Sequence, residues 1–259
     1  MTKMRGTSVL VAVEIAGVVC ASVLWAQAIQ KNAPSDPKAA ESKSAEIVTY
    51  QAKLMKAMWG DRTKVILTGG VKFTHGDTIL TCEEIQYDRE ENTAVSPGKV
   101  SVSDPQCEIT AEKGAVYFKK RLGVLEGNVV MLIKPRQEED RANVQAREDK
   151  ESIRAKFSKP TTVTCSKLDY DYRSKVATAS GGVTLRQERR TVTAEKLIYD
   201  DKKQLVTLIG NVKGVDEEGQ TFQSPDKVVI CIKKGSEWME APNATATFKV
   251  EVEDQPSSK

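Results

Sequence analysis

The chain has 259 residues, enough for one or two domains with a buried core. Its 39 Lys and Arg nearly balance its 36 Asp and Glu, which excludes a strongly basic nucleic-acid-binding protein and an acidic solvating tail. The single histidine, His75, excludes a metal site built from several histidines, and we expect neither a metal ion nor a cofactor.

The N-terminus has the pattern of an export segment. A basic start precedes an apolar stretch, residues 6–30, in which Glu14 is the only charge. One interpretation is a signal peptide, residues 1–28, that is cleaved after the small-x-small sequence Ala26-Gln27-Ala28. The other is an uncleaved hydrophobic helix anchored in the inner membrane, because about 20 apolar residues span a bilayer. In both cases we expect a periplasmic protein, with residues 29–60 as a polar linker and lead-in.

A repeat of 29 residues organises the rest of the chain. Five segments share a Gly-x-Val core, and their first glycines are Gly69, Gly98, Gly127, Gly181 and Gly210. The intervals between these glycines are 29, 29, 54 and 29 residues, and the long interval equals 29 plus 25. The extra length falls on the charged segment 136–159, which we interpret as a solvated insertion.

A second element keeps register with the first. Twelve residues after the glycine comes a run such as Thr81–Asp88 or Thr193–Asp200, and Thr164–Asp171 has the same pattern beyond the insertion. Apolar and polar residues alternate in both elements, which is typical of strands with one buried face. The repeated glycines, which we expect on the apolar face, predict a bend that folds the sheet over on itself. The residues therefore predict a long antiparallel sheet folded into a trough.

Apolar residues of these strands are expected to line the interior of the trough. The candidates are Val71, Phe73, Ile85, Val100, Val129, Met131, Leu168, Val183, Leu185, Leu197 and Val212. Trp59 and Trp238 flank the repeats, and we expect them to cap the ends of this interior.

These repeats resemble the OstA-like, LptA and LptC family of lipopolysaccharide-transport proteins. The clearest stretch is Thr191–Val212, TVTAEKLIYDDKKQLVTLIGNV, and the resemblance extends over about Lys64–Val252 with segment 136–159 outside it. It implies an open antiparallel β-jellyroll over residues 61–252, with a tail at 253–259. It also implies that lipopolysaccharide or a related glycolipid is bound by its acyl chains in the interior. The implied protein partners are other Lpt-type subunits, stacked edge to edge, and an inner-membrane transporter for an anchored form.

Two other functions compete with lipid transport. A structural repeat with a filled core would assemble edge to edge and carry no lipid, because alternating apolar residues usually form a core. An enzyme such as a polysaccharide lyase would need clustered Asp, Arg or Lys on one face, and the repeated positions do not supply such a cluster. We therefore expect no catalytic residues.

Four cysteines lie beyond the leader: Cys82, Cys107, Cys165 and Cys231. Cys82 and Cys165 occupy equivalent positions two repeats apart. The expected distance between their Cα atoms exceeds the roughly 7 Å limit for a disulfide, because neighbouring strands lie about 4.8 Å apart. We expect these two to be small buried thiols, while a bridge that involves Cys107 or Cys231 stays open.

Three aspartates, Asp88, Asp171 and Asp200, each follow directly after a tyrosine. Repeated Asp in a β-repeat can bind calcium, but the Gly-Gly-x-Gly-x-Asp pattern is absent from the sequence. Capping of tight turns is the preferred interpretation.

Overall fold

The computed structural model describes residues 48–59, 63–75, 77–105, 107–134, 159–233, 235–247 and 249. Within these ranges the chain is all-β: its strands form one antiparallel sheet of 18 strands, and no helix occurs. Accordingly, these residues contain no helix long and apolar enough to cross a membrane. The predicted leader at 1–28, the body of segment 136–159 and the tail at 253–259 lie outside the described residues.

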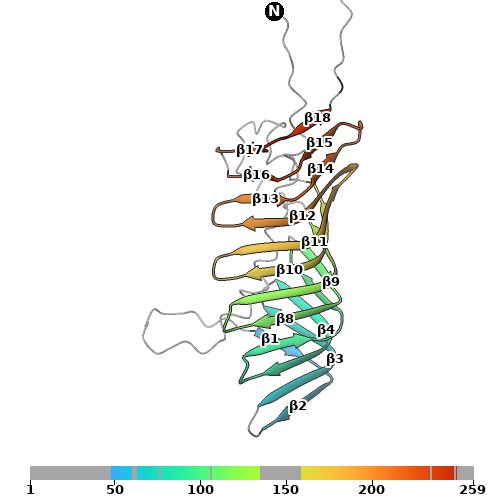
Figure 1. The fold of residues 1–259 in the computed structure, drawn as a ribbon. Coiled ribbons are helices and arrows are strands. Elements are labelled where there is room, and N and C mark those ends of the chain that lie inside the picture. The colour runs from blue at the N-terminus through green and yellow to red at the C-terminus, as the bar shows by residue number, and fades with distance from the viewer. Residues whose placement is uncertain are drawn as a thin grey trace, which may run out of the picture.

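The strands follow one another in chain order along a tall stack (Figure 1). The first nine are β1 (Val48–Gln51), β2 (Leu54–Met58), β3 (Lys64–His75), β4 (Thr78–Asp88), β5 (Thr93–Ser96), β6 (Val100–Ser103), β7 (Cys107–Ala111), β8 (Lys113–Tyr117) and β9 (Leu122–Ile133). The others are β10 (Thr161–Asp171), β11 (Val176–Gln187), β12 (Arg190–Asp200), β13 (Leu205–Ile209), β14 (Val212–Val215), β15 (Thr221–Ser224), β16 (Lys227–Cys231), β17 (Trp238–Glu240) and β18 (Thr245–Thr247).

The sheet is folded lengthwise into two layers. Long strands cross both layers: β10 pairs with β11 through residues 162–164 and again through 167–171, with a register shift between the two halves. Elsewhere two short strands replace one long strand, as where β13 and β14 both pair with β12. We call the layer that contains β2, β5, β8, β13, β16 and β17 the first layer. The second layer contains β1, β6, β7, β14, β15 and β18, and the line of register shifts between the layers is the crease.

Strand lengths explain the 29-residue spacing. Strands β3, β5 and β9 begin at Lys64, Thr93 and Leu122, at intervals of 29 residues. Beyond the charged segment, β11 and β13 begin at Val176 and Leu205, again 29 residues apart. Within one interval β11 has 12 residues and β12 has 11, and turns of two and four residues follow them. One repeat thus consists of a strand that crosses both layers, a turn, and a second strand that crosses both layers in the opposite direction, followed by another turn.

The crease is made by glycines in the left-handed region. Gly69, Gly127, Gly181 and Gly210 have φ between 77° and 85°. The expectation that these glycines lie on the apolar face is wrong: a Cβ at these positions would meet Lys53, Glu112, Ser166 and Glu195, respectively. The expectation that they bend the sheet is confirmed, because the register shifts between Ser180 and Val183, and between Thr68 and Val71, fall at such glycines. A side chain there is disfavoured by the positive φ, so glycine is the natural residue.

The sheet starts earlier than the sequence indicates. Residues 29–60 were expected to be linker and lead-in, yet they contain β1 and β2. Strand β1 pairs with one half of β3 and β2 with the other, so they extend both layers by one strand. Neither strand contains the Gly-x-Val signature, because each covers one layer only and never crosses the crease.

The charged segment joins two strands that pair as a hairpin. Ile133 at the end of β9 pairs with Thr161 at the start of β10, whereas two residues join β3 to β4 and β11 to β12 at the equivalent position. We predict that deletion of residues 136–159, which leaves Lys134, Pro135 and Pro160 as the connection, preserves the sheet. Short hairpin connections are common between antiparallel strands. Circular dichroism and thermal unfolding test this, and loss of cooperative unfolding would show that the segment belongs to the fold.

Candidate functional site

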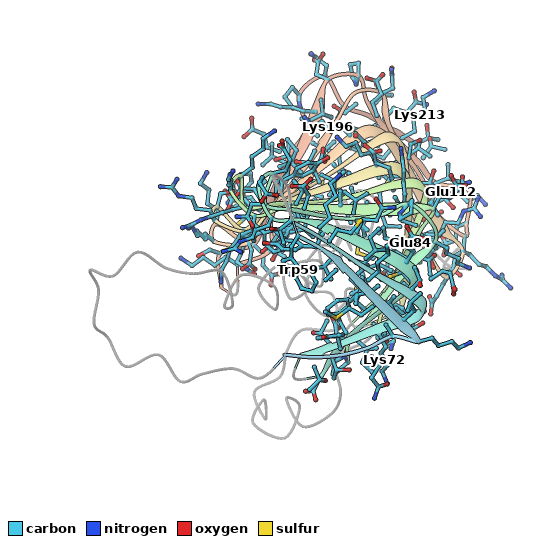
Figure 2. The ribbon with its side chains drawn as sticks, turned by 90° about the horizontal axis from the view of Figure 1, so that it is seen from below. Trp59, Lys72, Glu84, Glu112, Lys196 and Lys213 are labelled. Atoms are coloured by element: carbon cyan, nitrogen blue, oxygen red, sulfur yellow. The ribbon has the colours of Figure 1, made fainter. Side chains whose placement is uncertain are left out.

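The space between the two layers is the candidate site. Apolar side chains of both layers face one another there and form one hydrophobic cluster along the stack. Viewed along the stack, the charged side chains Glu84, Glu112, Lys196 and Lys213 lie around the outside of the curved sheet (Figure 2). The sheet is therefore polar outside and apolar inside, as the alternation in the sequence indicates.

All eleven predicted interior residues belong to this cluster or pack against it. Nine are at most 2% exposed: Val71, Val100, Val129, Met131, Leu168, Val183, Leu185, Leu197 and Val212. Phe73 and Ile85 are partly buried against the same cluster. The structure thus brings together residues that are up to 141 positions apart in the sequence, from Val71 to Val212.

Further residues line the interior beyond the eleven candidates. Ala177, Tyr199, Val206, Leu208, Val228 and Ile230 have 0% exposure. The last four belong to β13 and β16. Their alternation in Leu205–Ile209 and Lys227–Cys231 is the signal that identifies them.

Closure of the interior changes along the stack. In the middle of the stack Val129 and Met131 in β9 and Leu168 in β10 are at most 2% exposed, whereas Val65, Phe73 and Ile85 at the N-terminal end are only partly covered. Met239 and Ala241 at the C-terminal end are also partly exposed. The interior is therefore closed by its own side chains in the middle and more accessible at both ends.

The N-terminal end exposes a group of large apolar side chains. Tyr50, Leu54, Met55 and Trp59 are 52%, 61%, 53% and 82% exposed. The Tyr50 ring lies 6.0 Å from that of Phe73, which joins this group to the interior. The expectation that Trp59 caps the interior is wrong, because most of its surface is exposed; Trp238, at the start of β17, is 44% exposed. In the described residues β1, β2, β17 and β18 each pair on one side only, so both ends of the stack present free strand edges.

The buried tyrosines differ in their hydrogen bonds. The Tyr199 hydroxyl donates to Asp201 Oδ1 at 3.0 Å and accepts from Gln204 Nε2 at 3.1 Å. The Tyr170 hydroxyl is buried without a hydrogen-bond partner among the described residues, and burial raises its pKa. Tyr170 thus holds a donor that a polar ligand atom would satisfy.

All four described cysteines are buried and free. The expected buried thiols at Cys82 and Cys165 are confirmed, and Cys107 and Cys231 form no bridge in the structure. Burial raises the pKa of Cys82 and Cys107, and it raises the pKa of Cys165 to about 11. These thiols are weak nucleophiles at neutral pH and serve as small apolar side chains.

The raised thiol pKa values predict a loss of stability at high pH. The unfolded chain ionises its thiols near 9.0, while the folded thiol of Cys165 stays neutral up to about 11. The stability that these neutral thiols contribute is full below pH 9 and is lost as the pH rises toward 11. We expect the melting temperature to fall in that window. Ala111 and Ala194 are buried at the equivalent positions of other repeats, so Cys165→Ala is a conservative change. This variant should reduce the slope of the free energy of unfolding against pH by about 1 kcal/mol per pH unit between pH 9 and 11. If the variant kept the same dependence of stability on pH, the neutral buried thiol of Cys165 would not be its cause.

The recurring aspartates cap turns of the first layer. Oδ1 of Asp88 accepts from the Glu91 amide at 3.0 Å, Oδ1 of Asp171 from Arg173 at 2.8 Å, and Oδ1 of Asp200 from Lys203 at 3.1 Å. Partial burial alone would raise the pKa of Asp171, but hydrogen bonds from Ser174 and Arg173 outweigh it and the pKa is lowered. The described residues contain no cluster of His, Cys, Asp and Glu that would hold a metal ion.

Backbone hydrogen bonds join neighbouring turns of the first layer into a continuous ledge. They run from Arg89 N to Thr63 O, Phe118 N to Asn92 O, Tyr172 N to Arg121 O, Asp201 N to Lys175 O and Ile232 N to Gln204 O, at 2.9–3.1 Å. These turns lie at the strand ends farthest from the crease, so the ledge forms one lip of the folded sheet.

A family model for LptC-related lipopolysaccharide-assembly proteins matches residues 139–217. The match starts inside the charged segment, which was expected to lie outside the resemblance, and ends just beyond β14. It is therefore shorter than the expected range of 64–252. No curated protein matches the sequence.

Among solved structures, the chain is similar to LptH of Pseudomonas aeruginosa, the LptA-homologous periplasmic component of its lipopolysaccharide transport device. The identity is 14% and the TM-score 0.35, and the alignment covers 79% of this chain and 96% of LptH. The resemblance that the repeats indicate is confirmed at the level of the family model: over residues 139–217 the chain is similar to LptC-related lipopolysaccharide-assembly proteins.

Proposed function

We propose that this protein binds the acyl chains of lipopolysaccharide, or of a related glycolipid, between its two layers and helps to carry them across the periplasm to the outer membrane. The continuous apolar interior, which extends from Val71 in β3 to Ile230 in β16, is the observation that carries the proposal. Each buried methylene gains about 0.8 kcal/mol, so a long apolar space suits a ligand with several acyl chains. The eleven predicted interior residues are the proposed contacts, and no catalytic step is needed.

Acyl chains would enter by separation of the two layers. The strand ladders lie within each layer, so the layers can part at the side opposite the crease without loss of ladder hydrogen bonds. Acyl chains would then replace the contacts that interior side chains make across the gap. The partly exposed Phe73 and Ile85 offer a starting point for entry at the N-terminal end. The unpartnered Tyr170 hydroxyl would donate to an ester or amide carbonyl of the lipid.

The free strand edges supply docking surfaces for protein partners. A partner's edge strand would pair with β1 or β2 at one end and with β17 or β18 at the other, by β-augmentation. Exposed Leu54, Met55 and Trp59 make the N-terminal end the more apolar of the two. Other Lpt-type subunits are the proposed partners in the periplasm, and an inner-membrane transporter is the proposed partner if the N-terminal segment is retained as an anchor.

One observation favours a second function. Side chains such as Val129, Met131 and Val163 in β9 and β10 are 1% exposed, so the middle of the interior is already filled. A filled core needs no ligand, and the same free edges would then serve a structural protein that assembles edge to edge without lipid.

Lipid uptake separates the two functions. The full chain is expressed with its leader, recovered gently from a periplasm that contains lipopolysaccharide, and weighed by native mass spectrometry. We expect a population with a bound glycolipid. A clean apo mass, together with no uptake of added lipopolysaccharide, would favour the scaffold and reject the transport function.

A further inference from the structure

The ledge on the first layer carries a row of cations. Three consecutive turns, residues 118–121, 172–175 and 201–204, contain seven basic residues: Lys119, Lys120, Arg121, Arg173, Lys175, Lys202 and Lys203. We call these seven the basic ledge. Three acidic residues, Asp171, Asp200 and Asp201, stand beside them, so this stretch has a net charge of 7 minus 3, or +4. The whole chain has a net charge of only +3, which makes the ledge a local concentration of positive charge.

The opposite lip has the opposite charge. The charged residues in turns of the second layer, among the described residues, are Asp77, Asp104, Lys134, Lys159, Glu188, Arg189, Asp216, Glu217 and Glu218. Six of these nine residues are acidic, a net charge of 3 minus 6, or −3. The positive charge therefore belongs to one lip of the fold and is no general property of its turns.

Most cations of the basic ledge are not neutralised by the protein. Lys119 Nζ donates to the Glu90 carbonyl at 2.7 Å and Lys202 Nζ to the Arg173 carbonyl at 3.1 Å, and both acceptors are uncharged. Lys203 pairs with Asp200 at 3.1 Å. The exposed side chains of Lys120, Arg121 and Arg173 form no ion pair with any described residue.

Spacing along the ledge is regular. Neighbouring turns are separated by two strands, which places clusters of cations about 10 Å apart. The hydrogen bonds from Tyr172 N to Arg121 O and from Asp201 N to Lys175 O hold the three turns in a line. A ligand with more than one phosphate can thus contact two turns at once.

We propose that the basic ledge binds the phosphate groups of an anionic amphiphile whose acyl chains occupy the interior. This inference rests on the proposed function. An amphiphile with its chains between the layers leaves its headgroup at the side opposite the crease, where the ledge lies. Lysine and arginine are the natural partners of phosphate, arginine through paired hydrogen bonds. The ledge would orient the headgroup toward the first layer, because the acidic second lip repels it.

The test removes three ledge charges that form no ion pair with a described residue; of these, Lys120 Nζ lies 5.4 Å from the centre of the Tyr117 ring. The variant Lys120→Gln/Arg121→Gln/Arg173→Gln keeps Lys119 and Lys202, whose hydrogen bonds join neighbouring turns. The matched control is Lys72→Gln/Lys196→Gln/Lys213→Gln, which removes the same charge from the outside of the sheet (Figure 2). Binding to the full chain is measured with diphosphoryl lipid A, with monophosphoryl lipid A and with uncharged dodecyl maltoside, at low and high salt.

We expect the ledge variant to bind diphosphoryl lipid A about tenfold more weakly than the control, because three charge contacts at the surface are lost. The loss should be smaller for monophosphoryl lipid A, absent for dodecyl maltoside, and reduced at high salt. Equal binding of lipid A by the ledge and control variants would overturn the inference while the proposed function stands. Failure of the unaltered chain to bind any of the three amphiphiles would instead reject the proposed function.

Two further binding measurements show whether the phosphate bound by the ledge belongs to lipid A, to a free anion or to a membrane surface. Inorganic pyrophosphate alone should bind much more weakly than diphosphoryl lipid A, and equal affinity would show that the ledge is a site for free anions. Phosphatidylglycerol vesicles without lipid A report attraction to a membrane surface. If the ledge variant loses vesicle binding but keeps lipid A binding, the ledge faces a membrane and the inference is wrong.

Discussion

A charge placed in the interior is expected to abolish lipid capture. Val183 lies in the second layer with 1% exposure, and Leu197 lies in the first layer with 1% exposure. Val183→Asp or Leu197→Arg would bury a charge without a partner, which costs several kcal/mol. A charge and its bound water in the interior would also make contact with acyl chains unfavourable. Native mass spectrometry of each variant, recovered from the periplasm, measures the fraction of protein with bound glycolipid. We expect that fraction to fall to the background.

Thr184 supplies the matched control for Val183. It is the next residue in β11, faces outward between Thr164 and Thr193, and is not fully buried. Thr184→Asp should therefore capture lipid normally. Because Val183→Asp can unfold the protein, Val183→Thr is the milder variant: it keeps the shape, adds one hydroxyl, and is expected to cost about 1–2 kcal/mol and to reduce capture. A folded Val183→Asp protein that captures as much lipid as Thr184→Asp would refute the proposed contacts.

Periodicity in the sequence was sufficient to predict the layers but not the crease. The alternation around Leu168, Leu185 and Leu197 identifies strands with one buried face, and all three residues are buried. The glycines predicted a bend correctly, yet their side of the sheet was wrong. A period of two continues unchanged from Leu67 to Val71 in the sequence, while the structure inserts two positive-φ residues, Gly69 and Gly70, between them. Alternation alone does not reveal such a bulge.

The ends of the fold were harder to predict for a different reason. Strands β1 and β2 cover one layer each, so they lack the Gly-x-Val core by which the longer strands were found. Burial is also weakest there, and exposed Leu54 and Met55 break the alternation. The basic ledge was visible in principle, because its turns recur at the repeat spacing. Each turn looks like an ordinary solvated loop until the backbone hydrogen bonds place the turns side by side.

The crease offers the second large effect, in a pair of adjacent glycines. Gly181 and Gly182 have nearly the same φ, 81° and 78°, so an alanine at either position costs about 1–2 kcal/mol of backbone strain. Their surroundings differ: a Cβ on Gly181 would lie 2.6 Å from Ser166 Cβ, whereas a Cβ on Gly182 meets nothing within 4 Å. We therefore expect Gly181→Ala to lower the free energy of unfolding by about 3 kcal/mol, and Gly182→Ala by about half as much. Urea denaturation measures both.

A second substitution at Ser166 tests whether the contact between Ser166 and Gly181 causes the difference between the two alanine variants. Its Oγ donates to the Gly181 carbonyl at 2.7 Å, and its Cβ is the atom that an alanine would strike. In the double variant Ser166→Gly/Gly181→Ala the clash is gone, so the two changes should cost less together than the sum of their separate effects. The expected coupling is about 1 kcal/mol, typical of residues in direct contact. Additive effects, or equal losses in Gly181→Ala and Gly182→Ala, would show that the two strands do not touch at the crease. Since the proposed opening of the layers bends the sheet along this line, a tightened crease should also slow lipid uptake in Gly181→Ala relative to Gly182→Ala.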